Sequence, residues 1–218
     1  MLSIISTPIG NIKDITLRAI DTLKEADIIL AEDTRRIRKL LSHYEISLSG
    51  KQLTSLNENN IKQKTPYIIE AIKQNKKIAV VSDNGTPTIS DPGYYLVKEC
   101  VSAGIQPVSV PGPCALIAAL SISGLPTDKF VFFGFFPKKD KKRKEILEQI
   151  KNNDYTSIMY ESPYRINKTL DFFKKEIPDF NLVITRELTK MFEEVIRGKV
   201  KDIQGEFKGE LVLLLRKP

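Results

Sequence analysis

Two carboxylates and a guanidinium stand together near the start of the chain, in the segment Glu32-Asp33-Thr34-Arg35. The apolar run Ile28 to Ala31 before them has the composition of a buried strand, so these charges lie where a strand ends. A carboxylate in that position can accept the proton of a hydroxyl nucleophile or hold ribose hydroxyls, and Arg35 can bind a phosphate. The structural alternative is that Asp33 or Thr34 caps the following helix, with Arg35 paired nearby. Capping explains only one or two of the four residues, which favours a functional role.

A longer polar loop, Ser82 to Gly93, follows the apolar run Ile78 to Val81. Its glycines and two prolines fix the backbone direction, and its short polar side chains supply many hydrogen-bonding groups. Open α/β sheets bind ligands beyond the carboxyl ends of their strands, so we predict that this loop forms the floor of a ligand crevice. The end of the loop indicates a helix start, with Asp91 as N-cap and Pro92 at the first helical position.

Two further loops, Thr7 to Asn11 and Pro111 to Pro113, also follow short apolar runs. If the strands are parallel, all four loops lie at the same edge of one sheet. The chain has no G-x-G-x-x-G segment and no glycine-lysine phosphate loop. Rigid turns that contain proline offer carbonyl groups and shape more than a nest of N–H groups. A cationic or neutral adenosine-like ligand therefore fits these loops better than a polyphosphate.

Strands and helices are expected to alternate five times in the first half of the chain, which is typical of an α/β fold with a doubly wound, mainly parallel sheet. The break at Gly124-Leu125-Pro126 predicts a boundary between two α/β domains, 1–125 and 126–218. The second half is expected to form a mixed sheet in which the fully apolar run Leu211 to Leu215 is a central strand. Because no low-complexity linker separates the halves, we expect them to share a ligand cleft.

Charged residues also follow the strands expected in the second half, in Tyr160 to Arg165 and in Thr185 to Lys190. Each of these signals is weak by itself, and surface ion pairs are the default explanation for them.

The composition is that of a globular protein, with 41% hydrophobic and 28% charged residues, and the net charge of +7 favours an acidic partner such as nucleic acid. With one histidine and two cysteines that lack metal-ligand spacing, zinc chemistry and histidine triads are not expected. Reduced cysteines fit a cytoplasmic protein. A basic cluster at the start of an expected helix is the candidate polyanion contact: Lys138, Lys139, Lys141, Lys142, Arg143 and Lys144.

Taken together, the loops resemble those of the ribosomal RNA small subunit methyltransferase I family, a branch of the tetrapyrrole methylase superfamily. The resemblance extends from Leu2 to about Leu215. The segments that carry it are Ser6 to Asn11 with Asp14 to Thr16, Ala31 to Arg35, Ser82 to Gly93, Pro111 to Ala115, Tyr160 to Ser162 and Arg186 to Lys190.

The resemblance implies a homodimeric enzyme that uses S-adenosylmethionine and no metal to methylate the 2′-oxygen of a cytidine ribose in the decoding region of small-subunit (16S) ribosomal RNA. It also implies two α/β domains with the cofactor in the cleft between them. Carried over by motif, the cofactor-binding residues are Pro8, Ser82, Asp83, Gly85, Thr86, Pro87, Ile89, Pro111, Gly112, Tyr160, Leu188, Gly209, Glu210 and Leu211.

A ribose hydroxyl needs a proton acceptor during methyl transfer, and Glu32, Asp33 and a neutral Lys190 are the candidates, with Arg35 positioning RNA phosphate. Asp33→Ala is then expected to retain cofactor binding and lose methyl transfer. Two other functions stay open at this point. One is methylation of a tetrapyrrole or another small molecule on the same fold, and the other is a non-catalytic RNA-binding role in ribosome assembly.

Overall fold

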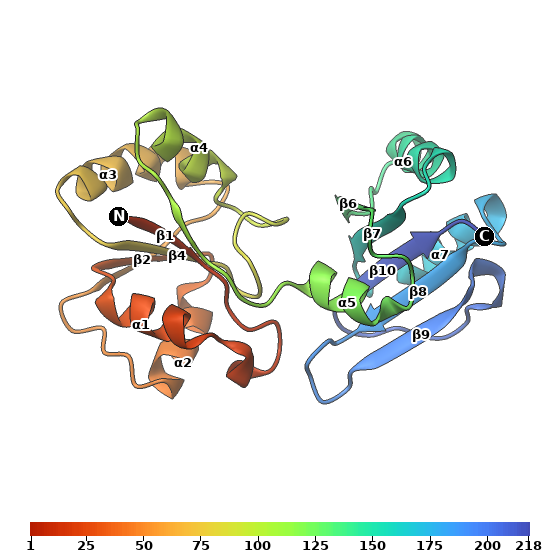
Figure 1. Cartoon of the computed structure of the whole chain (residues 1–218), viewed down its shortest axis with the longest axis horizontal. Helices are drawn as coiled ribbons and strands as arrows, with labels where there is room; N and C mark the ends of the chain where they lie inside the picture. Colours follow the sequence, from red (N-terminus) through yellow and green to blue (C-terminus); the bar gives the residue numbers. More distant parts are fainter. The chain divides into compact units, whose positions relative to one another are not determined.

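The computed structural model describes residues 1–218, which form two compact units, Met1–Cys114 and Ala115–Pro218. The first unit is an α/β sandwich whose five strands and four α-helices alternate along the chain (Figure 1). Its elements are β1 (Leu2–Ile5), the short 3-10 helix η1 (Ile12–Asp14), α1 (Leu17–Glu25), β2 (Ile28–Ala31), α2 (Thr34–His43), β3 (Gln52–Ser55), α3 (Ile61–Lys73), β4 (Ile78–Val81), α4 (Tyr94–Ser102) and β5 (Val108–Val110).

The first sheet has the strand order β3-β2-β4-β1-β5, and every pairing in it is parallel. Side chains alternate between its faces, so that Ile29 and Ala31 pack with α1 and α2 while Ile28 and Leu30 pack with α3 and α4. Figure 1 shows these helix pairs on opposite faces of the sheet. The predicted doubly wound parallel sheet is confirmed, and its strands all end at one edge.

Local chemistry explains where the helices of this unit begin and end. Thr16 caps α1, because its side-chain oxygen accepts a hydrogen bond from Ala19 N at 3.1 Å. Beyond α4, Gly104 adopts the left-handed conformation, with a φ of 74°, and Ile105 N donates to Cys100 O. This is the usual C-cap of an α-helix that ends at a glycine. The predicted cap at Asp91 is wrong: α4 begins at Tyr94, and its N-cap is Gly93. Asp91 is therefore available for another role.

The second unit contains a five-stranded mixed sheet in the order β6-β7-β10-β8-β9. β6 is parallel to β7, and the other pairings are antiparallel, which confirms the predicted mixed sheet. The apolar strand β10 lies at the centre, as expected. The elements are α5 (Ala115–Ser123), β6 (Phe130–Phe135), α6 (Asp140–Asn152), β7 (Thr156–Glu161), α7 (Ile166–Glu176), β8 (Asn181–Arg186), β9 (Glu194–Lys199), the short 3-10 helix η2 (Val200–Asp202) and β10 (Leu211–Arg216).

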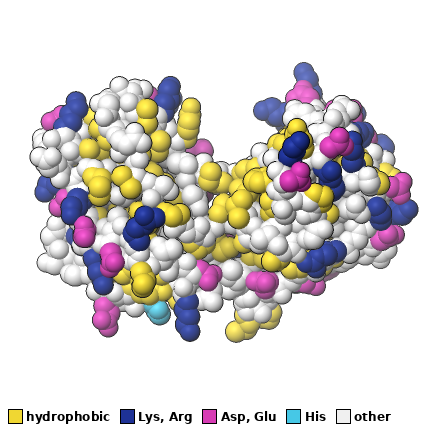
Figure 2. Space-filling model, in the orientation of Figure 1, with side chains coloured by type: hydrophobic (Ala, Val, Ile, Leu, Met, Phe, Trp, Pro, Cys, Tyr) yellow, Lys and Arg dark blue, Asp and Glu magenta, His cyan; other side chains and the backbone are white.

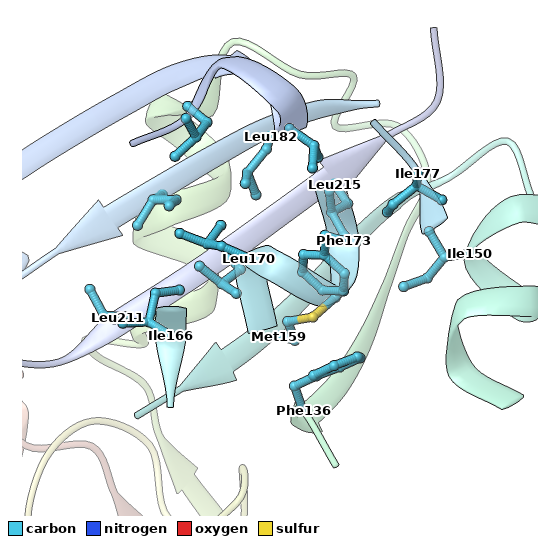
Figure 3. Packing of buried hydrophobic residues seen from close by; sticks show 14 of the residues in the cluster. Phe136, Ile150, Met159, Ile166, Leu170, Phe173, Ile177, Leu182, Leu211 and Leu215 are labelled. Carbon is cyan, nitrogen blue, oxygen red and sulfur yellow. The ribbon is translucent and has the colours of Figure 1, made fainter. Parts of the chain in front are cut away.

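One apolar core holds this unit together, and Figure 3 shows how side chains of α7 meet those of β7, β8 and β10. Phe173 and Phe136 are both almost fully buried, and their rings lie 5.0 Å apart in an edge-to-face arrangement. None of the helices in either unit is long and apolar enough to cross a lipid bilayer.

Helix α5 packs against β7 and β10, so it belongs to the second unit. The compact units thus divide between Cys114 and Ala115, whereas the domain boundary predicted from the sequence follows Leu125. The difference arises because Gly124-Leu125-Pro126 is the turn after α5, inside the second unit, and not a linker between units.

A buried ion pair stabilises the end of β7. Glu161 is almost completely buried, and its carboxylate contacts Arg165 Nη2 at 2.5 Å, Ser162 N at 2.7 Å and Thr169 Oγ1 at 2.5 Å. Arg165 also donates to Phe136 O at 3.1 Å. The default interpretation of these charges as surface pairs is therefore wrong for Glu161 and Arg165, which belong to the interior of the unit.

Removing this carboxylate is expected to destabilise the protein strongly. Glu161→Ala leaves Arg165 partly buried without its partner, which typically costs about 3–5 kcal/mol. Urea unfolding at neutral pH measures the loss. The control is Glu194→Ala, which removes the partner of Arg186 at a more exposed site and is expected to cost about 1 kcal/mol or less. Equal losses in the two variants would contradict the buried pair.

Candidate functional site

The loops after β1, β4 and β5 are joined by a hydrogen-bond network at the carboxyl edge of the first sheet. Thr7 and Gly85 exchange two backbone hydrogen bonds, of 2.8 and 3.0 Å. Thr7 Oγ1 donates to Ser82 O at 3.1 Å, and Ser82 Oγ donates to Gly85 O at 2.8 Å. Thr86 Oγ1 lies 2.9 Å from Ser6 Oγ and donates to Pro113 O at 3.0 Å. These hydrogen bonds thus fix three of the four predicted loops relative to one another.

Two glycines permit this close approach. Gly85 has a φ of 83°, and a Cβ there would lie 3.3 Å from Ile9 Cγ2. A Cβ on Gly112 would lie 3.0 Å from Ser6 Cβ. Gly85 is therefore required by both backbone conformation and space, and Gly112 by space alone.

The fourth loop, after β2, joins the same edge through Asp83. Asp33 N donates to Asp83 Oδ1 at 2.9 Å, and Arg36 Nε lies 3.6 Å from Asp83 Oδ2. The predicted meeting of all four loops at one edge of the sheet is confirmed.

The side chain of Asp33 caps helix α2 and forms an ion pair with Arg35. Its Oδ1 accepts from Arg35 N at 2.8 Å, which caps α2, and both of its oxygens accept from the Arg35 guanidinium at 2.7 to 3.2 Å. These bonds lower the pKa of Asp33 to about 2, which makes this carboxylate a weak base. The capping and pairing alternative considered for Asp33 and Arg35 is therefore confirmed by the geometry.

The pKa values of Glu32 and Asp91 are shifted upward, in the opposite direction to that of Asp33. Although Glu32 is an exposed residue, partial desolvation of its carboxyl, followed by the negative charges of Asp83 and Glu58, raises the pKa of that group. Burial, followed by the charges of Glu32 and Asp83, raises the pKa of Asp91 to about 6, although the neighbouring Ser82 hydroxyl acts against this. Such carboxylates are better proton acceptors at neutral pH than an ordinary one. Asp91 was missed as a functional candidate because its position before a helix suggested a cap.

Four of the six non-glycine residues with positive φ lie in two of the predicted site loops. They are Thr88 and Ser90 after β4, and Glu187 and Thr189 after β8. A side chain pays a conformational cost in this region, and such strain is concentrated at functional loops in proteins. The backbone strain in these two loops therefore favours a functional role for both of them, beyond connecting two elements.

In the second unit, Lys190 lies between two carboxylates. Its Nζ is 3.1 Å from Glu187 Oε1 and 3.1 Å from Glu210 Oε2. Burial lowers the pKa of Lys190, but its bonds to Glu210 and Glu187 outweigh that effect and leave the pKa above its usual value. The hypothesis of a neutral Lys190 that accepts a proton is therefore wrong, because its own partners hold it as an ammonium.

Gly209 completes this cluster. It has a φ of 87°, and a Cβ there would lie 2.4 Å from Glu187 Oε1. The same oxygen accepts from Glu210 N at 2.8 Å, and Glu187 N donates to Glu210 O at 3.0 Å. Among the candidates of this unit, the structure thus brings together Lys190, Gly209 and Glu210, with Leu188 and Leu211 buried beside them.

The remaining predicted residues differ in accessibility. Tyr160 packs edge-to-face on Phe132 and Phe135, with ring centroids 4.9 and 5.5 Å away. Pro8 and Pro87 are buried in the first unit, whereas Ile89, Pro111 and Gly112 are exposed. The exposed group can therefore touch a ligand directly, and the buried prolines shape the loops behind it.

The basic cluster of the second unit forms the start of α6, as predicted, but its residues are not equivalent. Arg143 is mostly buried: its Nε donates to Pro137 O at 2.9 Å, and its guanidinium lies over the rings of Phe136 and Phe172 at 5.7 and 5.9 Å. Its role is therefore structural. The five lysines of the cluster are exposed: Lys138, Lys139, Lys141, Lys142 and Lys144.

Two concave regions of the first unit lie near the amino ends of its strands. One is lined by Asp27, Gln52 and Lys76, and another by Met1, Ile78 and Val108. None of the predicted site residues lines them. No group of three histidine, cysteine or acidic side chains in the structure has the arrangement of a metal site.

A family model for Tetrapyrrole (Corrin/Porphyrin) Methylases matches residues 1–204. The chain therefore belongs to the tetrapyrrole methylase family. Within that family it is similar to the proteins named ribosomal RNA small subunit methyltransferase I. That of Thermotoga maritima is 45% identical, with 98% of this chain and 97% of the relative aligned, and that of Vibrio cholerae is 46% identical, with 99% and 76% aligned. The resemblance expected from the loop motifs is confirmed.

Solved structures support the fold independently of sequence. A diphthine synthase matches with a TM-score of 0.78 at 14% identity, covering 99% of this chain and 89% of that one. The methyltransferase CobJ matches with a TM-score of 0.73 at 18% identity, covering 99% and 93%. At such identities the likeness concerns the fold alone.

Proposed function

We propose that this protein uses S-adenosylmethionine to methylate small-subunit ribosomal RNA, at the 2′-oxygen of a cytidine ribose in the decoding region. The observation that carries the proposal is the meeting of four loops, with Glu32 and Asp91, at the carboxyl edge of the first sheet. The name shared by relatives that are 42 to 46% identical supports ribosomal RNA as the substrate.

The charge of the site suits this cofactor. S-adenosylmethionine supplies a methyl group on a positively charged sulfonium, and the carboxylates of Glu32, Asp83 and Asp91 give the loop edge a negative potential. The absence of a side chain at Gly112 lets the loop after β5 lie directly against Ser6, so the two loops present their edge as one rigid unit. We assign cofactor binding to Pro8, Ser82, Asp83, Gly85, Thr86, Pro87, Ile89, Pro111 and Gly112 in the first unit, and to Tyr160, Leu188, Gly209, Glu210 and Leu211 in the second.

Methyl transfer to a ribose hydroxyl requires that its proton leave as the new bond forms, and we assign Glu32 as the acceptor. Its raised pKa makes it a better base than Asp33, whose oxygens are occupied by Arg35. We assign Asp33 and Arg35 to holding the start of α2. Lys190, as an ammonium, orients Glu187 and Glu210.

The five exposed lysines at the start of α6 supply a second region of positive charge for RNA phosphate. The proposal also implies a cytoplasmic protein that acts on ribosomal RNA or on an assembling small subunit. The homodimer implied by the resemblance stays a prediction, which light scattering coupled to size-exclusion chromatography measures directly.

The proposal is tested by incubating small ribosomal subunits from cells that lack this protein with the purified protein and S-adenosylmethionine. Mapping of 2′-O-methylation is expected to show one new site, at a cytidine of the decoding region. Transfer to a base, to another region or to a tetrapyrrole instead would refute the assignment. If cofactor binding is also absent from calorimetric titrations, a non-catalytic role in ribosome assembly is the better explanation.

Asp91→Asn is expected to stabilise the protein at neutral pH while it weakens activity. The Asp91 carboxyl has a pKa of 3.8 in the unfolded chain and about 6 in the folded protein, so it binds a proton more tightly when folded. The wild type therefore loses stability as the pH rises from 3.8 through about 6, and asparagine, which carries no charge, avoids this loss. The full shift corresponds to about 3 kcal/mol, which partial solvent exposure reduces to about 1 kcal/mol. Urea unfolding is expected to show the gain at pH 7.5 and almost none at pH 4. A variant that is less stable at pH 7.5 would contradict this prediction.

A further inference from the structure

Helix α2 has an unusual charge composition. It carries Arg35, Arg36, Arg38 and Lys39 within its first six residues and contains no acidic residue. Every other helix with a lysine or arginine also has an aspartate or glutamate within it, including α6, which contains Asp140, Glu145 and Glu148. The exposed face of α2 is therefore the one helical surface in the protein with cations alone.

This arrangement opposes helix stability. Arg35 and Arg38, Arg36 and Lys39, and Arg35 and Lys39 are three or four residues apart, where like charges repel across one turn. Cations near the start of a helix also oppose its dipole. The buried face, formed by Ile37, Leu40 and Leu41, accounts for the fold of the helix but not for its charges.

The four cations differ in the partners they have. Arg35 is paired with Asp33, and Arg36 lies 3.6 Å from Asp83. The side chains of Arg38 and Lys39 are exposed and make no hydrogen bond or ion pair in the structure. Their charges are thus left for a partner outside the chain.

The position of the helix indicates which partner this is. α2 begins two residues after Glu32, and Arg38 and Lys39 lie about 6 to 8 Å along its axis from its first residue. A ribose that presents its hydroxyl to Glu32 carries its own phosphates on both sides, so the nucleic acid backbone must pass near this helix. Figure 2 shows lysine and arginine side chains on the part of the first unit where Figure 1 places α1 and α2.

We propose that the exposed face of α2 is an RNA-binding surface, on which Arg38 and Lys39 hold the phosphates next to the nucleotide that reacts at Glu32. This inference rests on the proposed function and adds to it a first-unit contact separate from α6. A row of cations along a helix suits a polyanion, whereas a single small anion requires donors that converge on one point.

The test is the binding of small-subunit ribosomal RNA across a series of salt concentrations, for the wild type and for Arg38→Gln/Lys39→Gln. The variant is expected to bind about tenfold more weakly at about 0.15 M salt, and the slope of log affinity against log salt is expected to fall by about 1.5. Calorimetry is expected to show unchanged binding of S-adenosylmethionine, which also shows that the variant is folded. Arg38→Lys alone keeps the charge and is expected to retain the wild-type slope.

The matched control is Lys73→Gln/Lys98→Gln, which removes two exposed cations from α3 and α4 on the opposite face of the same sheet. It is expected to leave RNA affinity within about twofold of the wild type. Equal losses in the two double variants would mean that net charge alone matters, and wild-type binding by Arg38→Gln/Lys39→Gln would refute the surface. Failure of the wild type to methylate small subunits would refute the proposed function, and the binding comparison would still decide the role of α2.

Discussion

Glu32→Gln is expected to reduce methyl transfer to small ribosomal subunits by about 10²- to 10⁴-fold, the usual contribution of a positioned proton acceptor. Glutamine has the shape of glutamate but cannot accept the hydroxyl proton. The loss is expected in the single-turnover rate constant, measured with saturating cofactor and subunits, while calorimetric binding of S-adenosylmethionine is preserved. In the wild type the same rate constant is expected to fall at acidic pH, because the Glu32 carboxyl, whose pKa is raised, then becomes protonated.

Asp33→Asn is the matched control for this experiment, since it changes the neighbouring carboxylate in the same way. Asparagine retains an oxygen that caps α2, so the variant is expected to stay folded and to keep its rate within about tenfold. If Asp33→Asn lost activity and Glu32→Gln retained it, Asp33 would be the proton acceptor despite its pKa of about 2.

Gly85→Ala is expected to weaken S-adenosylmethionine binding by about tenfold or more. The added Cβ would lie 3.3 Å from Ile9 Cγ2, which is a tight contact, so the loops after β4 and β1 must shift apart by a few tenths of an ångström. Cofactor binding must then return the loop to its wild-type position. If that movement costs about 1.4 kcal/mol, the affinity falls tenfold. Isothermal titration of the folded variant measures the effect.

Gly104→Ala separates this steric effect from backbone strain. Gly104 has a φ of 74°, close to the 83° of Gly85, but a Cβ there meets no atom within 4 Å. Both variants are expected to lose about 1–2 kcal/mol of stability from the left-handed conformation, while Gly104→Ala keeps its cofactor affinity. Equal affinities in the two variants would show that the contact between the loops does not determine cofactor binding.

The sequence is informative about the fold because its strands are short apolar runs separated by strong turn formers. β4, for example, reads Ile-Ala-Val-Val and is fully buried on both faces, which is typical of a parallel strand between two helical layers. The convergence of the four loops then follows from the parallel direction alone. The glycine and proline after α5 predict a boundary there and so place α5 in the first domain, whereas its packing on β7 and β10 puts it in the second unit.

The roles of individual charges were less predictable, because they depend on contacts between distant segments. Asp91 precedes a helix as a cap would, yet the charges that raise its pKa come from Glu32 and Asp83. In the sequence Arg143 is one of the six cations of the basic cluster, and only its contacts with two phenylalanine rings reveal a structural role. Glu161 is the last residue of β7 and Glu32 comes directly after β2, but Glu161 is buried in an ion pair whereas Glu32 is exposed.

The placement of β10 affects how the chain folds during its synthesis. All five strands of the first sheet lie within Met1–Cys114, so that sheet can form while the rest of the chain is still being translated. The second sheet cannot, since β10, which pairs with both β7 and β8, is its last strand in chain order. Until β10 leaves the ribosome, β7 and β8 each have an unpaired, largely apolar edge, and such edges promote aggregation. The second unit is therefore the part of the nascent chain with the greater need for a chaperone.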